Sequence, residues 1–150
     1  MTGFTLVELI MVLILVGILL LFVIPRFFDR GTFDARAIGD EVQSMVRYAQ
    51  KLAVARNGKI YICTTPNGIS LGADDSCAQS VLLPSSKSAT LSRSDLLISP
   101  AKIFYFDGLG KPFNKGDTES STFVKTRFDL TTGGTTQSFF VEQETGYVHQ

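Results

Sequence analysis

The chain has 150 residues, of which 45% are hydrophobic, and its 14 basic and 14 acidic side chains give a formal net charge of zero. This length permits one domain plus an added segment, and the neutral charge argues against a general nucleic-acid binder or a polybasic membrane ligand. The charges are unevenly distributed, because the first 24 residues contain a single charged side chain, Glu8.

Residues 4–24 form an apolar run that is interrupted only by Thr5, Glu8 and Gly17. A helix needs roughly 20 apolar residues to cross a hydrocarbon core of about 30 Å. A cleaved secretory signal is the first alternative, but no basic residue precedes Arg26 and no small-residue cleavage site follows the run. We therefore expect a membrane-spanning helix.

Glu8 is an unusual residue for such a helix, because a carboxylate in hydrocarbon costs at least a few kcal/mol and is by default a candidate functional group. A cation to pair with it would arise if the chain were cleaved between Gly3 and Phe4. In a stack of helices, the new terminal amine of one chain would then meet Glu8 of its neighbour. The alternative is that Glu8 stays solvated among the lipid headgroups.

Residues 3–10, Gly-Phe-Thr-Leu-Val-Glu-Leu-Ile, resemble the cleavage and methylation motif of type IV prepilins. In that family a prepilin peptidase cuts after the glycine and methylates the new amine, and the glutamate helps to insert each subunit into a helical filament. The resemblance implies that Gly3 is the last residue of a leader, that Phe4 becomes the N-methylated first residue and that Glu8 acts in assembly.

The same resemblance implies a location and a set of partners. Residues 1–3 would be the prepilin leader, although they lack the basic residues that such leaders usually carry. Gly17 and Pro25 also match positions in the N-terminal helix of pilins. The mature chain would be a single-pass inner-membrane protein with a periplasmic C-terminal domain. Its partners would be the prepilin peptidase and other pilin or pseudopilin subunits of a pilus or pseudopilus.

Residues 25–58 are expected to continue the helix after a kink or local melting near residue 25, because Pro25 lacks a backbone donor. Asp34 suits a helix start, and Asn57 followed by Gly58 suits a helix stop. One helix over residues 4–56 would be about 80 Å long at 1.5 Å per residue.

The second part of this helix is amphipathic. The apolar stripe comprises Ile38, Val42, Met45, Ala49, Leu52 and Ala53. The opposite, polar side comprises Asp40, Glu41, Gln43, Ser44, Arg47, Gln50 and Lys51. A coiled coil is the alternative, but the stripe is shorter than four heptads, so we expect it to pack against a sheet.

Residues 59–150 are expected to form a β-rich globular domain, because the apolar period changes after Gly58. The predicted strands are 59–63, 68–72, 81–83, 96–98, 103–106, 122–130, 139–141 and 147–148, with a serine-rich loop at 84–93. The predicted fold class is α+β, in which a long N-terminal helix packs on a C-terminal antiparallel sheet. This is the lollipop arrangement of pilins.

Three short segments, residues 48–55, 103–108 and 145–148, are similar to minor pilins and pseudopilins of the type II secretion H/FimT group and of mannose-sensitive haemagglutinin pili. The expected function is a structural subunit that joins or primes a type IV pilus-like filament. The alternatives are an H-type pseudopilin of type II secretion and a filament-tip pilin that binds DNA or a surface. DNA is not favoured, because residues 60–150 carry seven basic and nine acidic side chains.

Cys63 and Cys77 are the only two cysteines. In an exported domain they would meet an oxidising compartment, so we expect a disulfide, to which the chain-entropy model assigns about 3 kcal/mol for a 15-residue loop. Two buried thiols are the alternative. A metal site is not expected, because no further cysteine or histidine lies nearby.

Nothing in the sequence suggests an enzyme or a cofactor, because the single histidine is His149 and no nucleophile or phosphate-loop motif is present. The acidic groups at residues 74–75 and 117–119 are candidate calcium ligands. They do not match an EF-hand loop, so solvated polar loops are favoured. Phe113 and the pair at residues 139–140 are expected in the core rather than on an adhesive surface.

Overall fold

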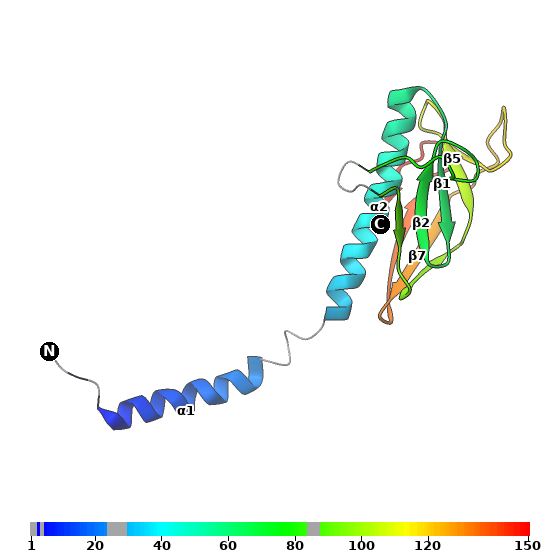
Figure 1. Ribbon diagram of the computed structural model, residues 1–150. Helices are drawn as coiled ribbons and strands as arrows, with labels where there is room; N and C mark the ends of the chain where they lie inside the picture. Colours follow the sequence, from blue (N-terminus) through cyan, green and yellow to red (C-terminus); the bar gives the residue numbers. More distant parts are fainter. Residues whose placement is uncertain (1–2, 4, 24–29, 84–87) are drawn as a thin grey trace.

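The computed structural model describes residues 3, 5–23, 30–83 and 88–150. Within them, helices α1 (Leu6–Val23) and α2 (Arg30–Arg56) precede nine strands. Figure 1 shows α2 lying along the β-rich body, with α1 at the N-terminal end of the chain. Phe4, Pro25 and the predicted kink lie outside the described residues, so whether α1 and α2 form one continuous helix stays a prediction.

Thr5 is the N-cap of α1. The backbone N–H of Glu8 donates to the side-chain Oγ1 of Thr5 at 3.3 Å and to its carbonyl oxygen at 3.1 Å. A threonine cap with glutamate three residues later is the pattern of a capping box, in which the cap satisfies a backbone donor of the first turn.

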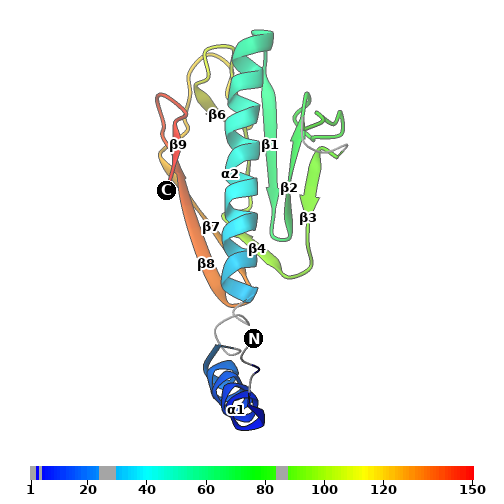
Figure 2. The ribbon, with the colours of Figure 1, turned by 90° about the vertical axis from the view of Figure 1, so that its left-hand side faces the viewer.

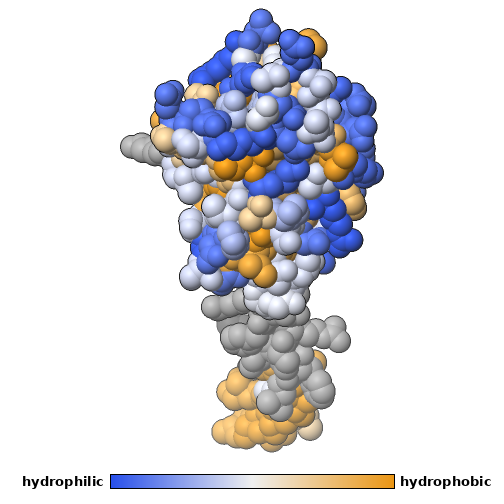
Figure 3. Space-filling view, turned by 90° about the vertical axis from the view of Figure 1, so that its right-hand side faces the viewer, coloured by the Kyte–Doolittle hydropathy of each residue, from blue (hydrophilic) through white to orange (hydrophobic). Residues whose placement is uncertain are grey.

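The side chains of α1 at residues 6–20 are all exposed, and Figure 3 shows the visible side of this helix as hydrophobic surface. Among the described residues, however, no helix combines the length and the hydropathy that a membrane span requires. The 21-residue run on which that expectation depends includes Phe4 and Ile24, which are not described.

The predicted end of α2 is confirmed, whereas its predicted beginning at residue 25 lies outside the described residues. Among the described residues α2 is helical from Arg30, four residues before Asp34, since the single glycine there, Gly31, costs only about 1 kcal/mol in a helix. α2 ends at Arg56. Asn57 then adopts a positive φ of 46°, and the N–H of Gly58 donates to a carbonyl of the last turn at 3.0 Å, which caps the helix.

The apolar stripe of α2 packs against the body, as predicted. Its buried members are Ala35, Ile38, Val42, Met45, Val46, Ala49 and Ala53, with Leu52 half-buried. The helix contacts strands of both sheets, so the coiled-coil alternative is not what the structure shows. Gln43, predicted on the polar side, is buried, because it lies one helical turn after Gly39, which packs against Gln137 of β8.

The strands form two antiparallel sheets. The first has the order β3-β2-β1-β5-β6, with bounds β1 (Ile60–Thr65), β2 (Gly68–Gly72), β3 (Thr90–Ser92), β5 (Ile103–Phe106) and β6 (Pro112–Asn114). The second has the order β4-β7-β8-β9, with bounds β4 (Leu96–Ser99), β7 (Thr126–Thr132), β8 (Thr135–Val141) and β9 (Val148–His149). In Figure 2, α2 runs lengthwise between β1–β3 on one side and β7–β9 on the other. The α+β class is therefore confirmed.

Several strand boundaries differ from the prediction. Residues 81–83 are not a strand, because that segment joins β2 only through a single bridge at Ser80 and one hydrogen bond at Val81. The two short strands β3 and β6 were missed, because three residues are too few to show an alternating pattern. β7 starts four residues later than predicted and β8 four residues earlier, because β8 opens with polar residues that pair with β7.

The core lies between α2 and the two sheets. It is rich in phenylalanine, since Phe104 stacks on Phe128 with ring centroids 5.7 Å apart, and Phe128 stacks on Phe139 at 5.1 Å. Phe113 is also buried, and its ring stacks on Tyr105 at 5.2 Å. The expectation that Phe113 and Phe139 are core residues is confirmed, whereas Phe140 is only half-buried.

Candidate assembly site

The predicted processing and assembly residues lie at the start of α1. Gly3 and Glu8 are exposed, while Phe4 and Pro25 lie outside the described residues. The Glu8 carboxylate has no hydrogen-bond or ion-pair partner among the residues that the structure describes. The backbone of Glu8 is fixed by the Thr5 cap, so its side chain is held in the first turn of the helix.

The rest of α1 is an exposed apolar surface. Over residues 6–20, the exposed fractions of its large apolar side chains range from 46% at Val16 to 74% at Leu6. Exposed apolar patches of this kind mark contacts with other proteins or with lipid. Glu8 is the single charged residue in this helix. An electrostatic contact between α1 and a neighbouring chain would therefore form at the first turn, and it would fix the position of an otherwise uniform apolar surface.

The structure joins Cys63 in β1 to Cys77 in a disulfide. The loop that it closes packs tightly, because a Cβ on Gly72 would lie 2.5 Å from the Cα of Cys77. Asp74 organises the same loop, since its carboxylate accepts hydrogen bonds from the hydroxyl of Ser76 and, at 2.6 Å, from the N–H of Gln79. These bonds, that of Ser76 first, lower the pKa of Asp74 to about 2.

In the second acidic group, residues 117–119, an aspartate carboxylate also orders its own loop. The carboxylate of Asp117 accepts hydrogen bonds from the backbone N–H groups of Thr122 at 2.8 Å and Asn114 at 2.9 Å, and the Thr122 bond is the main cause of its lowered pKa. In the described part of the chain, no three His, Cys, Asp or Glu side chains are grouped in a way that would hold a metal ion. Both candidate calcium loops therefore use these aspartates to hold their own backbone.

Gln50 joins two of the three segments that resemble minor pilins and pseudopilins, residues 48–55 and 145–148, and also binds the turn that follows the third. Its side-chain amide, half-buried on α2, donates to the carbonyl oxygens of Gly110 at 2.9 Å and Thr145 at 2.7 Å. Lys111 and Glu144, from the same two loops, form an ion pair at 2.6 Å. The helical pattern predicts Gln50 on the solvent side, because its partners are backbone carbonyls that no sequence pattern reveals.

Polar contacts around Glu142 hold the C-terminal strand β9. His149 and Lys125 both contact the carboxylate of Glu142, at 2.8 and 2.7 Å. The hydrogen bond that His149 donates to Glu142 raises the pKa of His149, and the hydrogen bond that Lys125 donates is the main cause of the lowered pKa of Glu142. His149 therefore has a structural role in the C-terminal hairpin.

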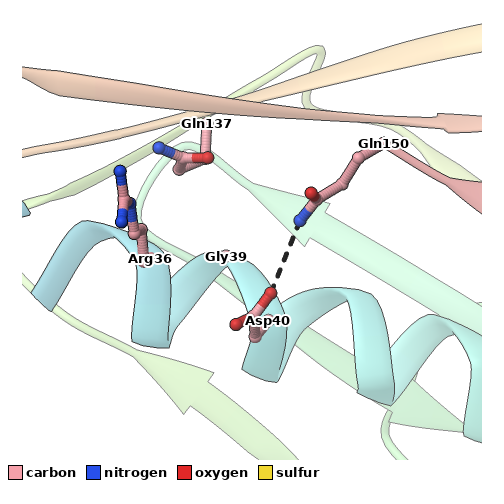
Figure 4. Close-up of a pocket in the computed structure, with 5 residues that line it drawn as sticks. All are labelled: Arg36, Gly39, Asp40, Gln137 and Gln150. Atoms are coloured by element: carbon pink, nitrogen blue, oxygen red, sulfur yellow. Dashed lines mark hydrogen bonds between the residues drawn. The ribbon is translucent and has the colours of Figure 1, made fainter. Parts of the chain in front are cut away.

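A polar hollow of about 360 Å³ lies between the first half of α2 and β8 (Figure 4). It is lined by Arg36, Gly39, Asp40, Gln137 and Gln150. The amide of Gln150 donates to Asp40 across 3.4 Å. The lining contains no nucleophile with a general base, so this hollow offers no constellation for covalent catalysis.

Helix α1 presents an exposed apolar surface, and helix α2 packs on two antiparallel sheets. Two solved structures match this chain, both of the type IV minor pilin FimU from Pseudomonas aeruginosa strain PAO1, in different crystal forms. One is 18% identical, with a TM-score of 0.52 over 76% of this chain and 90% of that chain. The other is 18% identical, with a TM-score of 0.53 over 82% and 90%. The chain has the fold of a type IV minor pilin.

A scan against protein-family models found no match, and a search of curated proteins also found none.

Proposed function

We propose that this chain is a minor pilin or pseudopilin, a structural subunit that joins or primes a type IV pilus-like filament. The observation that carries the proposal is α1, an exposed apolar helix whose single charge, Glu8, lies in the first turn. The minor-pilin fold of the body supports it. Filament assembly would bury the apolar helices against one another and so remove their surface from water or lipid.

The proposal assigns each part of the chain a step in assembly. Residues 1–3 are a leader that a prepilin peptidase removes after Gly3, and Phe4 becomes the methylated N-terminus. Residues 4–24 then anchor the subunit in the inner membrane, with the body in the periplasm, and later enter the filament core. Residues 25–58 connect this anchor to the globular domain at 59–150, and Pro25 is the proposed kink between them.

Glu8 is the proposed assembly residue. In a filament of parallel helices, its carboxylate pairs with the terminal amine of a neighbouring subunit. A charged pair formed in apolar surroundings strongly discriminates against wrong registers, because a displaced subunit leaves both charges unpaired. The same mechanism applies in a pilus and in a type II secretion pseudopilus, and it needs neither an enzyme activity nor a cofactor.

The test is processing followed by recovery in filaments. When the chain is expressed with its own machinery, wild type should run as the shorter processed form and appear in sheared filaments. Gly3→Val should accumulate as full-length precursor on a gel. Gly17→Val is the matched control, because it makes the same change in the same segment away from the cleavage site and should be processed normally. Wild-type mobility of Gly3→Val would refute the assigned cleavage site.

A further inference from the structure

Strand β8 is paired along only part of one of its edges. β7 pairs with the whole of β8, from Thr135 to Val141, whereas β9 pairs only with Phe140 and Val141. Figure 2 shows β9 ending partway along β8, so the first part of β8 is an edge of the second sheet. Among the residues that the structure describes, no strand pairs with residues 135–139 on this side.

The backbone groups that point out of this open edge are those of Thr136 and Ser138. Successive residues of an antiparallel strand direct their N–H and C=O groups to opposite neighbours. The N–H of Glu142, directly after β8, donates toward β9, to the carbonyl oxygen of Tyr147 at 3.0 Å. Every second residue back from Glu142 faces the same way, so Thr136 and Ser138 face the side that β9 leaves uncovered. Their free donors and acceptors are the main-chain pattern that an added strand binds.

The polar hollow between α2 and β8 lies beside this open edge, because Gln137, the residue between Thr136 and Ser138, is one of its lining residues. Figure 4 shows Arg36 of α2 and Gln137 of β8 directed into the hollow from opposite walls. A strand added to the open edge would therefore have α2 on its inner side, as β9 has. We call the open edge of β8 together with the hollow the edge slot.

α2 presents a row of polar side chains along the line of β9. Arg47 binds the carbonyl oxygen of Val148, and Asp40 accepts the hydrogen bond of the Gln150 amide. The next member of the row is Arg36, one helical turn or about 6 Å before Asp40. In a strand that continues the line of β9, the next inward side chain after Gln150 is two residues on, or about 6.6 Å. Arg36 therefore lies where that side chain would point.

This part of α2 carries hydrogen-bond donors that the described residues leave unsatisfied. Arg36 is exposed and makes no hydrogen bond or ion pair with any residue that the structure describes. Gln43, one turn after Gly39, is only 5% exposed, and its Nε2 has no hydrogen-bond partner within the described part of the chain. Buried donors without a partner are rare in folded proteins. A ligand matched to this wall would supply oxygen atoms, and a carboxylate suits Arg36 best.

We propose that the edge slot binds an extended segment of a partner polypeptide, which joins the second sheet as a strand antiparallel to β8. The segment pairs its backbone with Thr136 and Ser138, and an acidic side chain opposite Gln137 pairs with Arg36. A second copy of this chain is not the proposed occupant, because its own β8 would bring a sheet and α2 against β9 of the first copy. The inference does not depend on the function proposed above.

The test is the binding of synthetic peptides to the full chain in detergent. The probe is a capped peptide of sequence Thr-Glu-Thr-Val-Thr, whose length matches residues 135–139 and whose glutamate would face inward opposite Gln137. At millimolar peptide, the amide protons of Thr136 and Ser138 should shift in NMR spectra and exchange more slowly with solvent. The same peptide, methylated on the backbone nitrogens of its first and third residues, should bind at least about tenfold more weakly, because those nitrogens would donate to β8.

A charge exchange tests the role of Arg36. Arg36→Glu should weaken binding of the glutamate peptide about tenfold, and a peptide with lysine in place of glutamate should bind this variant better than the glutamate peptide does. Arg56→Glu is the matched control, an equal charge change at the other end of α2, and should leave binding unchanged. Binding regained by changing the peptide excludes a folding defect as the cause of the loss.

Three results would overturn the inference. Unshifted amides of Thr136 and Ser138, or equal binding of the methylated peptide, would contradict strand addition at this edge. Equal binding of the glutamate peptide to wild type and to Arg36→Glu would contradict the acidic contact. A dimer that forms without peptide and is dissociated by Thr136→Pro, which removes an edge N–H, would assign the edge to a second copy. None of these measurements uses filaments, so each outcome is separate from the proposed function.

Discussion

Arg47 on α2 donates two hydrogen bonds to the backbone carbonyl of Val148, from Nε at 3.2 Å and from Nη2 at 2.9 Å. The two residues are 101 positions apart, so this contact fastens the last strand of the chain to the helix. Arg47→Met keeps the aliphatic length but removes both donors. We expect it to lower the free energy of unfolding by about 1–2 kcal/mol in thermal melts of the detergent-solubilised chain.

Lys51→Met is the control for Arg47→Met, because Lys51 has no partner within the described residues. Its effect should stay within about 0.5 kcal/mol. Equal stability of the two variants would mean that the contact between Arg47 and Val148 does not hold β9.

Gly146 lies where three segments meet. Its φ is +62°, and an added Cβ would lie 2.4 Å from the carbonyl oxygen of Gly110 and 2.7 Å from the amide nitrogen of Gln50. Gly146→Ala should therefore cost roughly 1–3 kcal/mol, from backbone strain and from disruption of the Gln50 hydrogen bonds. Gly134→Ala, at φ +80° with no atom nearby, carries the backbone strain alone. Chemical denaturation should show Gly146→Ala as the less stable of the two.

The Cys63–Cys77 disulfide restrains the unfolded chain. The double variant Cys63→Ala/Cys77→Ala should lower the free energy of unfolding by about 3 kcal/mol, as the chain-entropy model gives for a loop of this length. Wild type melted under reducing conditions should behave like this variant. If the reductant lowers the melting temperature of the cysteine-free variant as well, the loss in wild type does not report on the disulfide.

His149 should titrate above its ordinary pKa of 6.5, because Glu142 accepts its hydrogen bond in the folded chain. Stability gained in this way is fully present below the unfolded-state pKa and is lost as the pH rises through the folded-state pKa. Glu142→Gln should return the pKa of His149, followed by NMR, toward 6.5 and remove this pH dependence. Glu144→Gln, which breaks the separate pair with Lys111, should leave the His149 titration unchanged.

The elements that could be predicted from the sequence have a strong period in their apolar residues or a specific signal that ends a helix. The 3.6-residue stripe of α2 and the Asn57–Gly58 stop are local properties, and the aromatic strand at 103–106 is a continuous β-forming run. Thr5 as an N-cap was also available, since threonine followed three residues later by glutamate is a local signal.

The missed features depend on tertiary contacts. β6 is held as a strand by pairing with β5, and Gln43 and Gln50 are withdrawn from solvent by strands and loops distant in sequence. A helical wheel assigns both glutamines to the polar side, because it takes no account of strands and loops that are distant in sequence. The convergence of residues 48–55, 103–108 and 145–148 likewise required the fold, since nothing local brings them together.

The central claim is that Glu8 directs assembly, and recovery of Glu8→Val in sheared filaments tests it most directly. We expect Glu8→Val and Glu8→Gln to be processed and membrane-anchored but lost from filaments. Thr5→Val removes the N-cap hydroxyl without touching the carboxylate, so it should assemble far better than either. Filament recovery of Glu8→Val equal to wild type, with processing intact, would contradict the role of this carboxylate in assembly.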